Sequence, residues 1–123
     1  MLTHTVIRLP FLIATLLLVA CSGTDGSDTT PIVLSGANSG STVTAAVGQE
    51  LDVTLQTIGP GEYGTPSLSS PAIRFLDVSY PPPPNPGGPR QLFRFRAVSA
   101  GIVEVSVPHT VRDLPFSITV NVN

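Results

Sequence analysis

Apolar and polar side chains alternate strictly in four short segments of this chain, and this pattern limits what the chain can fold into more than any other feature. In the segment ELDVTLQT, Leu51, Val53 and Leu55 fall on one face, with acidic or polar residues on the other. A period of two is typical of half-buried β-strands, whereas an amphipathic helix repeats every 3.6 residues. We therefore predict four strands, at residues 50–57, 91–98, 101–107 and 115–122.

Three weaker segments complete the predicted domain, at residues 31–35, 41–47 and 72–80. In the last of them the adjacent Phe75 and Leu76 interrupt the alternation, which indicates a β-bulge or a change of the buried face. Turns rich in Gly and Pro separate the segments, and no window shows a helical stripe. Because about seven short strands are typical of the immunoglobulin fold, we predict an all-β, immunoglobulin-like antiparallel β-sandwich over residues 31–123.

Residues 1–30 have the composition of an export and attachment signal. Arg8 precedes an apolar run at residues 9–20, which is shorter than the roughly 20 residues that a transmembrane helix needs. The run ends in Leu-Val-Ala-Cys, which resembles a bacterial lipobox. That resemblance implies cleavage before Cys21 and acylation of its thiol. Cys21 is the only cysteine in the chain, so it has no disulfide partner.

We accordingly predict a signal peptide over residues 1–20 and a lipidated, flexible tether over residues 21–30, where no large apolar side chain occurs. Acyl chains on Cys21 would hold the protein on a lipid bilayer. Ser22 follows the cysteine, and resemblance to sorted bacterial lipoproteins then favours the outer membrane of the bacterial cell envelope. The alternative is an ordinary signal peptide that leaves Cys21 as a free thiol.

Charge and composition argue against several classes of function. Six basic residues stand against eight acidic ones, so the chain lacks the basic excess of a nucleic-acid-binding protein. Arg94 and Arg96 alternate along a strand, which is typical of a solvated outer face. His109 is the one histidine after the leader, expected to be a loop residue, and one histidine among scattered acids is a poor zinc site. His109 and Asp113 lack a nucleophile-elbow motif to complete a triad. We predict no enzyme, metal or cofactor.

Two long connections rich in Gly and Pro, residues 58–71 and 80–90, carry the remaining functional signal. The run of prolines at 81–84 fixes φ and favours an extended, stiff backbone. Stiff loops lose little conformational entropy on binding, which suits a recognition surface. The alternative is that the prolines protect a sheet edge against aggregation.

The order of these segments resembles that of the chagasin family of cysteine-peptidase inhibitors. The likeness rests on VGQELDVTL at residues 47–55, on a Gly-Gly pair before the aromatic strand, and on AVSAG at residues 97–101. It implies three loops at one end of an immunoglobulin-like sandwich, which fill the cleft of papain-like cysteine peptidases without covalent bonding. A peptidase of that class is the partner that the resemblance implies.

Each loop motif of that family is only partly present. The NPTTG loop and its aromatic correspond to TIGPGEYGTP, the GxGG loop to NPGGP, and the RPW loop to VPHTVRDLPF, in a chain without tryptophan. The resemblance gives nine candidate peptidase-binding residues: Gly59, Pro60, Gly61, Tyr63, Asn85, Gly87, Gly88, His109 and Arg112.

The leading hypothesis is an exported, membrane-tethered binding module that reversibly inhibits papain-like cysteine peptidases. The alternative is a non-inhibitory immunoglobulin-like envelope lipoprotein with a structural or adhesive role. This alternative is kept because a few hot-spot residues carry most of the binding energy of an interface. The tryptophan that the family has in its third loop is missing from this chain.

Overall fold

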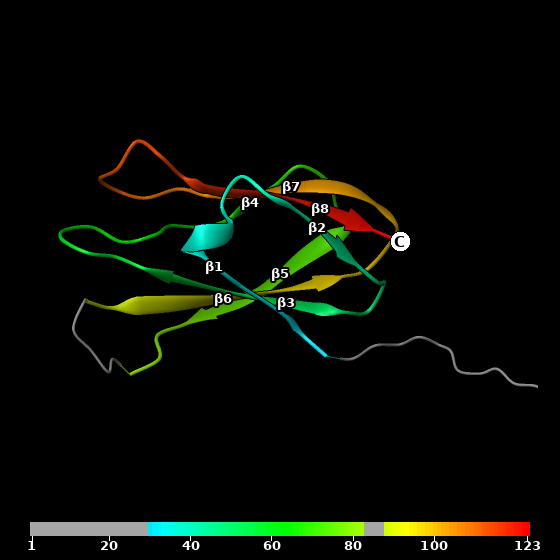
Figure 1. Ribbon diagram of the computed structural model, residues 1–123, viewed down its shortest axis with the longest axis horizontal. Helices are drawn as coiled ribbons and strands as arrows, with labels where there is room; N and C mark the ends of the chain where they lie inside the picture. The colour runs from blue at the N-terminus through cyan, green and yellow to red at the C-terminus, as the bar shows by residue number, and fades with distance from the viewer. Residues whose placement is uncertain (1–29, 83–87) are drawn as a thin grey trace, which may run out of the picture.

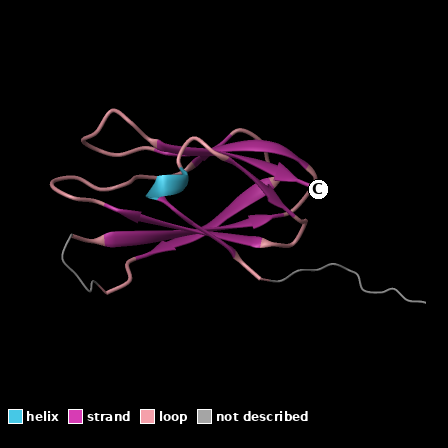
Figure 2. Cartoon of the chain, in the orientation of Figure 1, coloured by secondary structure: helices cyan, strands magenta, loops and turns pink. Residues whose placement is uncertain are grey.

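Two four-stranded sheets pack face to face in the computed structural model, which describes residues 30–82 and 88–123 (Figure 1). The predicted signal peptide, Cys21, Asn85 and Gly87 lie outside the described residues. In chain order the elements are β1 (Ile32–Ser35), the short 3-10 helix η2 (Gly36–Asn38), β2 (Thr42–Ala45), β3 (Glu50–Gln56), β4 (Ser67–Leu68), β5 (Ile73–Ser79), β6 (Arg90–Ala97), β7 (Gly101–Val107) and β8 (Phe116–Val122). The predicted all-β sandwich is confirmed, as Figure 2 shows by its predominance of strands.

The alternation seen in the sequence places the core side chains. Leu51, Val53 and Leu55 of β3 are buried, and so is Phe95 of the neighbouring β6. The ring of Phe75 on β5 packs 5.5 Å from the ring of Phe95, centroid to centroid. Because burial of such side chains is the main driving force of folding, the residues that alternate in the sequence are the ones that hold the two sheets together.

The order of strands is β1-β3-β6-β5 in one sheet and β2-β8-β7-β4 in the other. Most neighbouring strands run antiparallel to each other. However, β1 pairs parallel with β3, and β2 pairs parallel with β8. The sheets are therefore mixed, not antiparallel throughout as the sequence predicts. The physical reason is that a tight hairpin forces strands to run antiparallel. No hairpin joins β1 or β2 to its partner, since the chain crosses from one sheet to the other through η2.

An eighth strand lies inside the predicted loop at residues 58–71. It is β4, which pairs antiparallel with Val105 and Ser106 of β7. With only two residues, β4 has no room for a recognisable alternation, so the sequence pattern could not reveal it.

The predicted β-bulge in β5 is confirmed. The register of β5 against β6 shifts between Phe75 and Asp77. The extra residue, Leu76, is one of the two adjacent apolar residues that break the alternation in the sequence. Such a bulge bends its strand and increases the local twist.

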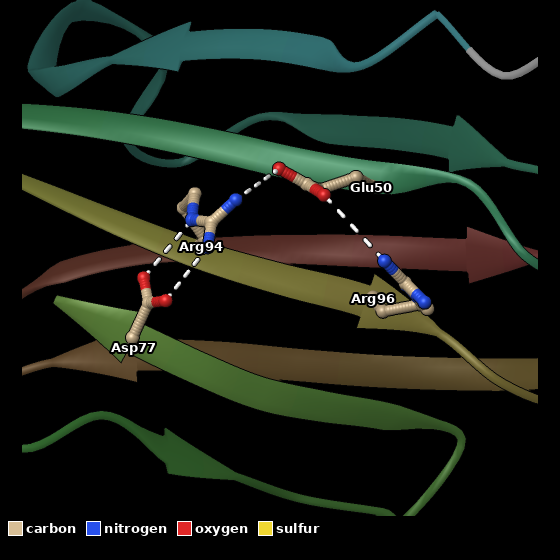
Figure 3. A network of polar contacts seen from close by, with 4 residues as sticks. All are labelled: Glu50, Asp77, Arg94 and Arg96. Atoms are coloured by element: carbon tan, nitrogen blue, oxygen red, sulfur yellow. Dashed lines mark hydrogen bonds and ion pairs between the residues drawn. The ribbon is translucent and has the colours of Figure 1, made fainter.

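Arg94 and Arg96 belong to a network of ion pairs on the outer face of the first sheet (Figure 3). The Arg94 guanidinium lies 2.7 Å from a carboxylate oxygen of Asp77 on β5 and 3.3 Å from one of Glu50 on β3. The Arg94 hydrogen bond lowers the pKa of the Asp77 carboxyl, and Asp77 in turn raises the pKa of Arg94. The alternating arginines thus form a charged outer face, as the sequence predicts.

Asp52 lies beside this network on β3. Its Oδ1 is buried without a hydrogen-bond partner, the one such side-chain atom in the described part of the chain. Burial, followed by the neighbouring Glu50 carboxyl, raises the pKa of Asp52 to about 6, and Arg94 opposes the rise. A negative charge on Asp52 is therefore disfavoured in the folded state.

All strands of the two sheets lie within residues 32–122, so this segment holds the whole of the described core. No helix within residues 30–82 and 88–123 is long and apolar enough to span a bilayer.

Candidate binding site at the loop end

Three loops lie at one end of the sandwich, at the left of Figure 1. The first loop is residues 57–66 between β3 and β4, the second is described at residues 80–82 and 88–89 between β5 and β6, and the third is residues 108–115 between β7 and β8. The start of β1 and the carboxyl terminus lie at the opposite end (Figure 1). We call the end that carries the three loops the loop end.

Backbone hydrogen bonds join the first and third loops. The Gly64 amide donates to the Pro108 carbonyl at 2.7 Å, and the Thr110 amide donates to the Glu62 carbonyl at 2.9 Å. Tyr63 and His109 form an antiparallel β-bridge between these contacts. The two loops therefore form one ribbon that projects beyond the sheets.

The close approach of these two loops depends on Gly61. Its φ is +93°, a conformation that residues with a side chain rarely adopt. A β-carbon at this position would lie 2.6 Å from Val111 Cγ2 and 2.8 Å from His109 Cε1. The candidate residue Gly61 is therefore needed for the first and third loops to pack against each other.

The second loop joins the first through Gly88 and Pro89. The Thr57 amide donates to the Pro89 carbonyl at 3.1 Å, and the Gln56 side chain donates to the Gly88 carbonyl at 3.1 Å. Gly88 has a φ of +108°, and a β-carbon there would lie 2.5 Å from the Thr57 carbonyl oxygen. All three loops are therefore in contact where they leave the sheets.

The described candidate residues come together at the loop end but differ in exposure. Gly59 and Pro60 form the exposed tip of the first loop, whereas Tyr63 is half-buried. Arg112 is exposed, and its guanidinium donates to the Ile58 carbonyl at 2.7 Å. His109 lies in a loop, as predicted, yet its side chain is only 8% exposed.

Exposed apolar side chains at the loop end were not among the sequence-predicted site residues. Leu114 is 82% exposed, Ile58 is 66% exposed and Val111 is 59% exposed. Large apolar side chains in loops at the end of a sandwich are candidates for contact with a partner. For Val111 and Leu114, the signal in the sequence is the presence of large apolar residues beside the charged Arg112 and Asp113 in VRDLP.

A groove of about 600 Å³ runs beside the third loop. It is lined by Gly36, Ser39 and Tyr63 and by residues 112–116. The exposed Leu114 borders this groove, so the apolar surface at the loop end has a concave part as well as a projecting one.

The polar side chains described at the loop end are mainly hydrogen-bonded to one another and to the backbone of the loops. The Nδ1 atom of His109 accepts hydrogen bonds from the Val111 and Arg112 amides, at 3.1 Å each, and so is not free to bind a carboxylate or a substrate proton. No cluster of three or more metal-ligating side chains occurs among the residues that the structure describes. What this surface offers is shape, apolar contact and backbone groups.

The sequence matches no family model and no curated protein. Among solved structures it is similar to the cysteine protease inhibitor EhICP2 from Entamoeba histolytica, with a TM-score of 0.65 and 7% identity over 80% of this chain and 100% of that one. The fold is chagasin-like. It is also similar to the solution structure of amebosin, with a TM-score of 0.56 and 18% identity over 76% of this chain and 100% of the amebosin chain.

Proposed function

We propose that this protein is an exported, membrane-tethered binding module that reversibly inhibits papain-like cysteine peptidases through its loop end. The observation that carries the proposal is the convergence of three loops at one end, with the first and third joined into a single projecting ribbon. The chagasin-like fold, shared with a cysteine protease inhibitor from Entamoeba histolytica, supports it.

The physical basis of such inhibition is a pre-formed wedge. Hydrogen bonds between the loops fix their shape before binding, so little conformational entropy is lost in the complex. The exposed side chains of Ile58, Val111 and Leu114 supply apolar surface, and its removal from water in the complex favours binding. The tethering part of the proposal rests on the lipobox-like Leu-Val-Ala-Cys at residues 18–21.

Titration of papain-like peptidases with residues 22–123 tests the inhibitory function. We expect active-site titration curves that saturate, with full recovery of activity after dilution because no covalent bond forms. Absence of inhibition at tens of micromolar would remove the inhibitor proposal.

A second candidate function is a structural or adhesive role in the cell envelope. The missing family residues favour it, since the chain has neither the tryptophan nor the paired threonines of the inhibitory loops. Photo-crosslinkers at positions 60 and 110 in cells separate the two functions, because envelope proteins rather than peptidases would be captured. A crosslinker at Ile102, exposed on β7 outside the loops, is the matched control.

A further inference from the structure

Thr57, Gln91 and His109 are the buried polar residues among those that the structure describes. All three lie where the loops leave the sheets. A buried polar group is unfavourable unless it is hydrogen-bonded, so the partners of these side chains indicate what they stabilise.

Gln91 holds the first loop through the backbone of Tyr63. Its Oε1 accepts from the Tyr63 amide at 2.8 Å, and its Nε2 donates to the Tyr63 carbonyl at 2.9 Å. The Tyr63 ring in turn contacts the His109 ring edge to face, with centroids 4.8 Å apart. The first loop therefore forms a fixed wall against which the His109 ring is placed.

His109 uses both ring nitrogens. Its Nδ1 accepts from two backbone amides of the third loop, those of Val111 and Arg112, at 3.1 Å each. Its Nε2 lies 3.4 Å from Thr57 Oγ1, across the interface with the first loop. Since Nδ1 receives two N–H groups, it carries no proton, and the ring proton must be on Nε2, where it points to Thr57.

We infer that His109, as the neutral Nε2–H tautomer, is the positioning residue that sets the shape of the third loop. By turning the chain at Val111 and Arg112, it directs Val111 and Leu114 outward and brings the Arg112 guanidinium to the Ile58 carbonyl, 2.7 Å away. The consequence for a partner rests on the proposed function, whereas the tautomer and the loop shape are properties of the free protein.

Two substitutions separate the roles of the two nitrogens. In His109→Asn the amide oxygen lies one bond beyond Cγ, as Nδ1 does, so it can accept from the same two amides while the contact with Thr57 is lost. In His109→Gln the amide reaches the region of Nε2 and leaves no acceptor near Val111 and Arg112. Both variants lose the aromatic contact with Tyr63, so they form a matched pair.

Hydrogen exchange of individual amides in residues 22–123 is the decisive measurement. In His109→Gln we expect protection of the Val111 and Arg112 amides to fall about tenfold, on the scale of one lost hydrogen bond. In His109→Asn that protection should stay within about threefold of the unmodified protein. The Thr110 amide, which donates to the Glu62 carbonyl, is the internal control. Equal loss of Val111 and Arg112 protection in both variants would overturn the inference.

The tautomer is tested without any substitution. A nitrogen-15 spectrum of the His109 ring at neutral pH should show the proton on Nε2 and an unprotonated Nδ1. A proton on Nδ1 would overturn the inference even if neither variant folds.

Peptidase titration of the same variants separates this inference from the proposed function. We expect His109→Gln to weaken inhibition at least tenfold more than His109→Asn. If the unmodified protein inhibits no peptidase while amide protection follows the expected pattern, the proposed function fails and the positioning role stands. If the unmodified protein inhibits and the two variants are equal in protection and inhibition, the positioning role fails.

Discussion

At the scale of single residues, glycines contribute to the shape of the loop end together with the buried polar side chains. Gly59 and Gly88 both have positive φ, but only Gly88 faces another backbone group closely. Near Gly59 there is nothing within 4 Å of the place where a β-carbon would lie. A substitution at Gly59 therefore measures the energetic cost of the backbone conformation alone. A substitution at Gly88 measures that cost together with the cost of a steric clash.

We predict that Gly88→Ala lowers the free energy of unfolding by about 2–4 kcal/mol, because strain adds to a clash with the Thr57 carbonyl. Gly59→Ala should cost only about 1 kcal/mol, from the backbone conformation alone. Urea unfolding of both variants measures the difference. Equal costs would show that the second loop moves away from Thr57 without penalty.

Asp52 gives the fold a dependence on pH. The pKa of its carboxyl rises from 3.8 to about 6 on folding, so the folded state binds the proton more tightly than the unfolded chain does. Its contribution to stability is therefore fully present below about pH 4 and is lost as the pH rises through 6.

Asp52→Asn should consequently raise the free energy of unfolding by about 1–2 kcal/mol at pH 7.5, with little gain at pH 4. This value is below the full conversion of the pKa change because the side chain is partly exposed and screened. Asp77→Asn is the matched control and should destabilise at pH 7.5, since Asp77 pairs with Arg94. A gain for Asp52→Asn that is the same at both pH values would contradict the assignment of the effect to ionisation.

At the scale of elements, β6 holds the first sheet together and β1 contributes least. Strand β6 pairs with both β3 and β5, and its Phe95 is buried between the sheets. Strand β1 is an edge strand of four residues whose Val33 is largely exposed. Substitutions in the two strands should therefore differ widely in effect.

We predict that Phe95→Ala lowers the free energy of unfolding by about 3–5 kcal/mol, through lost burial and the cavity left behind. Val33→Ala should change it by less than about 0.5 kcal/mol. Thermal unfolding followed by circular dichroism provides the comparison. Similar costs at the two positions would mean that the packing of β6 is not the main support of the first sheet.

The strands that the sequence reveals are those long enough to repeat a pattern. β3, β6, β7 and β8 each alternate over seven or eight residues, and the bulge in β5 shows as two adjacent apolar residues. β4 is too short to repeat anything. The parallel pairing of β1 with β3 and of β2 with β8 also leaves no mark in the sequence, because the period of two is the same in parallel and antiparallel strands.

The candidate site was predictable only in its place along the chain. Gly and Pro composition locates the loops, but most of the hydrogen bonds that join them have a backbone group as donor or acceptor, and backbone groups leave no mark in the sequence. The burial of His109 depends on Thr57 and Tyr63, residues distant along the chain. Residue type alone therefore suggests an ordinary loop histidine.

At the scale of the whole molecule, the loop end and the predicted tether should act independently. Leu114→Asp places a charge on a side chain that is 82% exposed, so we expect stability to change by less than about 0.5 kcal/mol. Inhibition of papain-like peptidases should weaken at least tenfold, since a charge in a desolvated interface is unfavourable. Ile102→Asp, outside the loops, should leave inhibition unchanged. Unchanged inhibition by Leu114→Asp would remove the third loop from the proposed interface.

We predict that Cys21→Ser moves the protein from the membrane fraction to the aqueous fraction of cells, because acylation of the thiol is lost. Metabolic labelling with palmitate should mark the unmodified protein and not the variant. Retention of Cys21→Ser on the membrane would contradict the lipid tether and leave the binding site unaffected.

The parallel pairing of β2 with β8 joins residue 42 to residue 119, almost the full span of the domain. A chain that crosses a membrane from its amino terminus first cannot form this pair until its last residues have emerged. Contacts so far apart in sequence also slow folding. In the proposed export, this topology would delay the final closure of the second sheet until the carboxyl-terminal strand β8 has crossed the membrane.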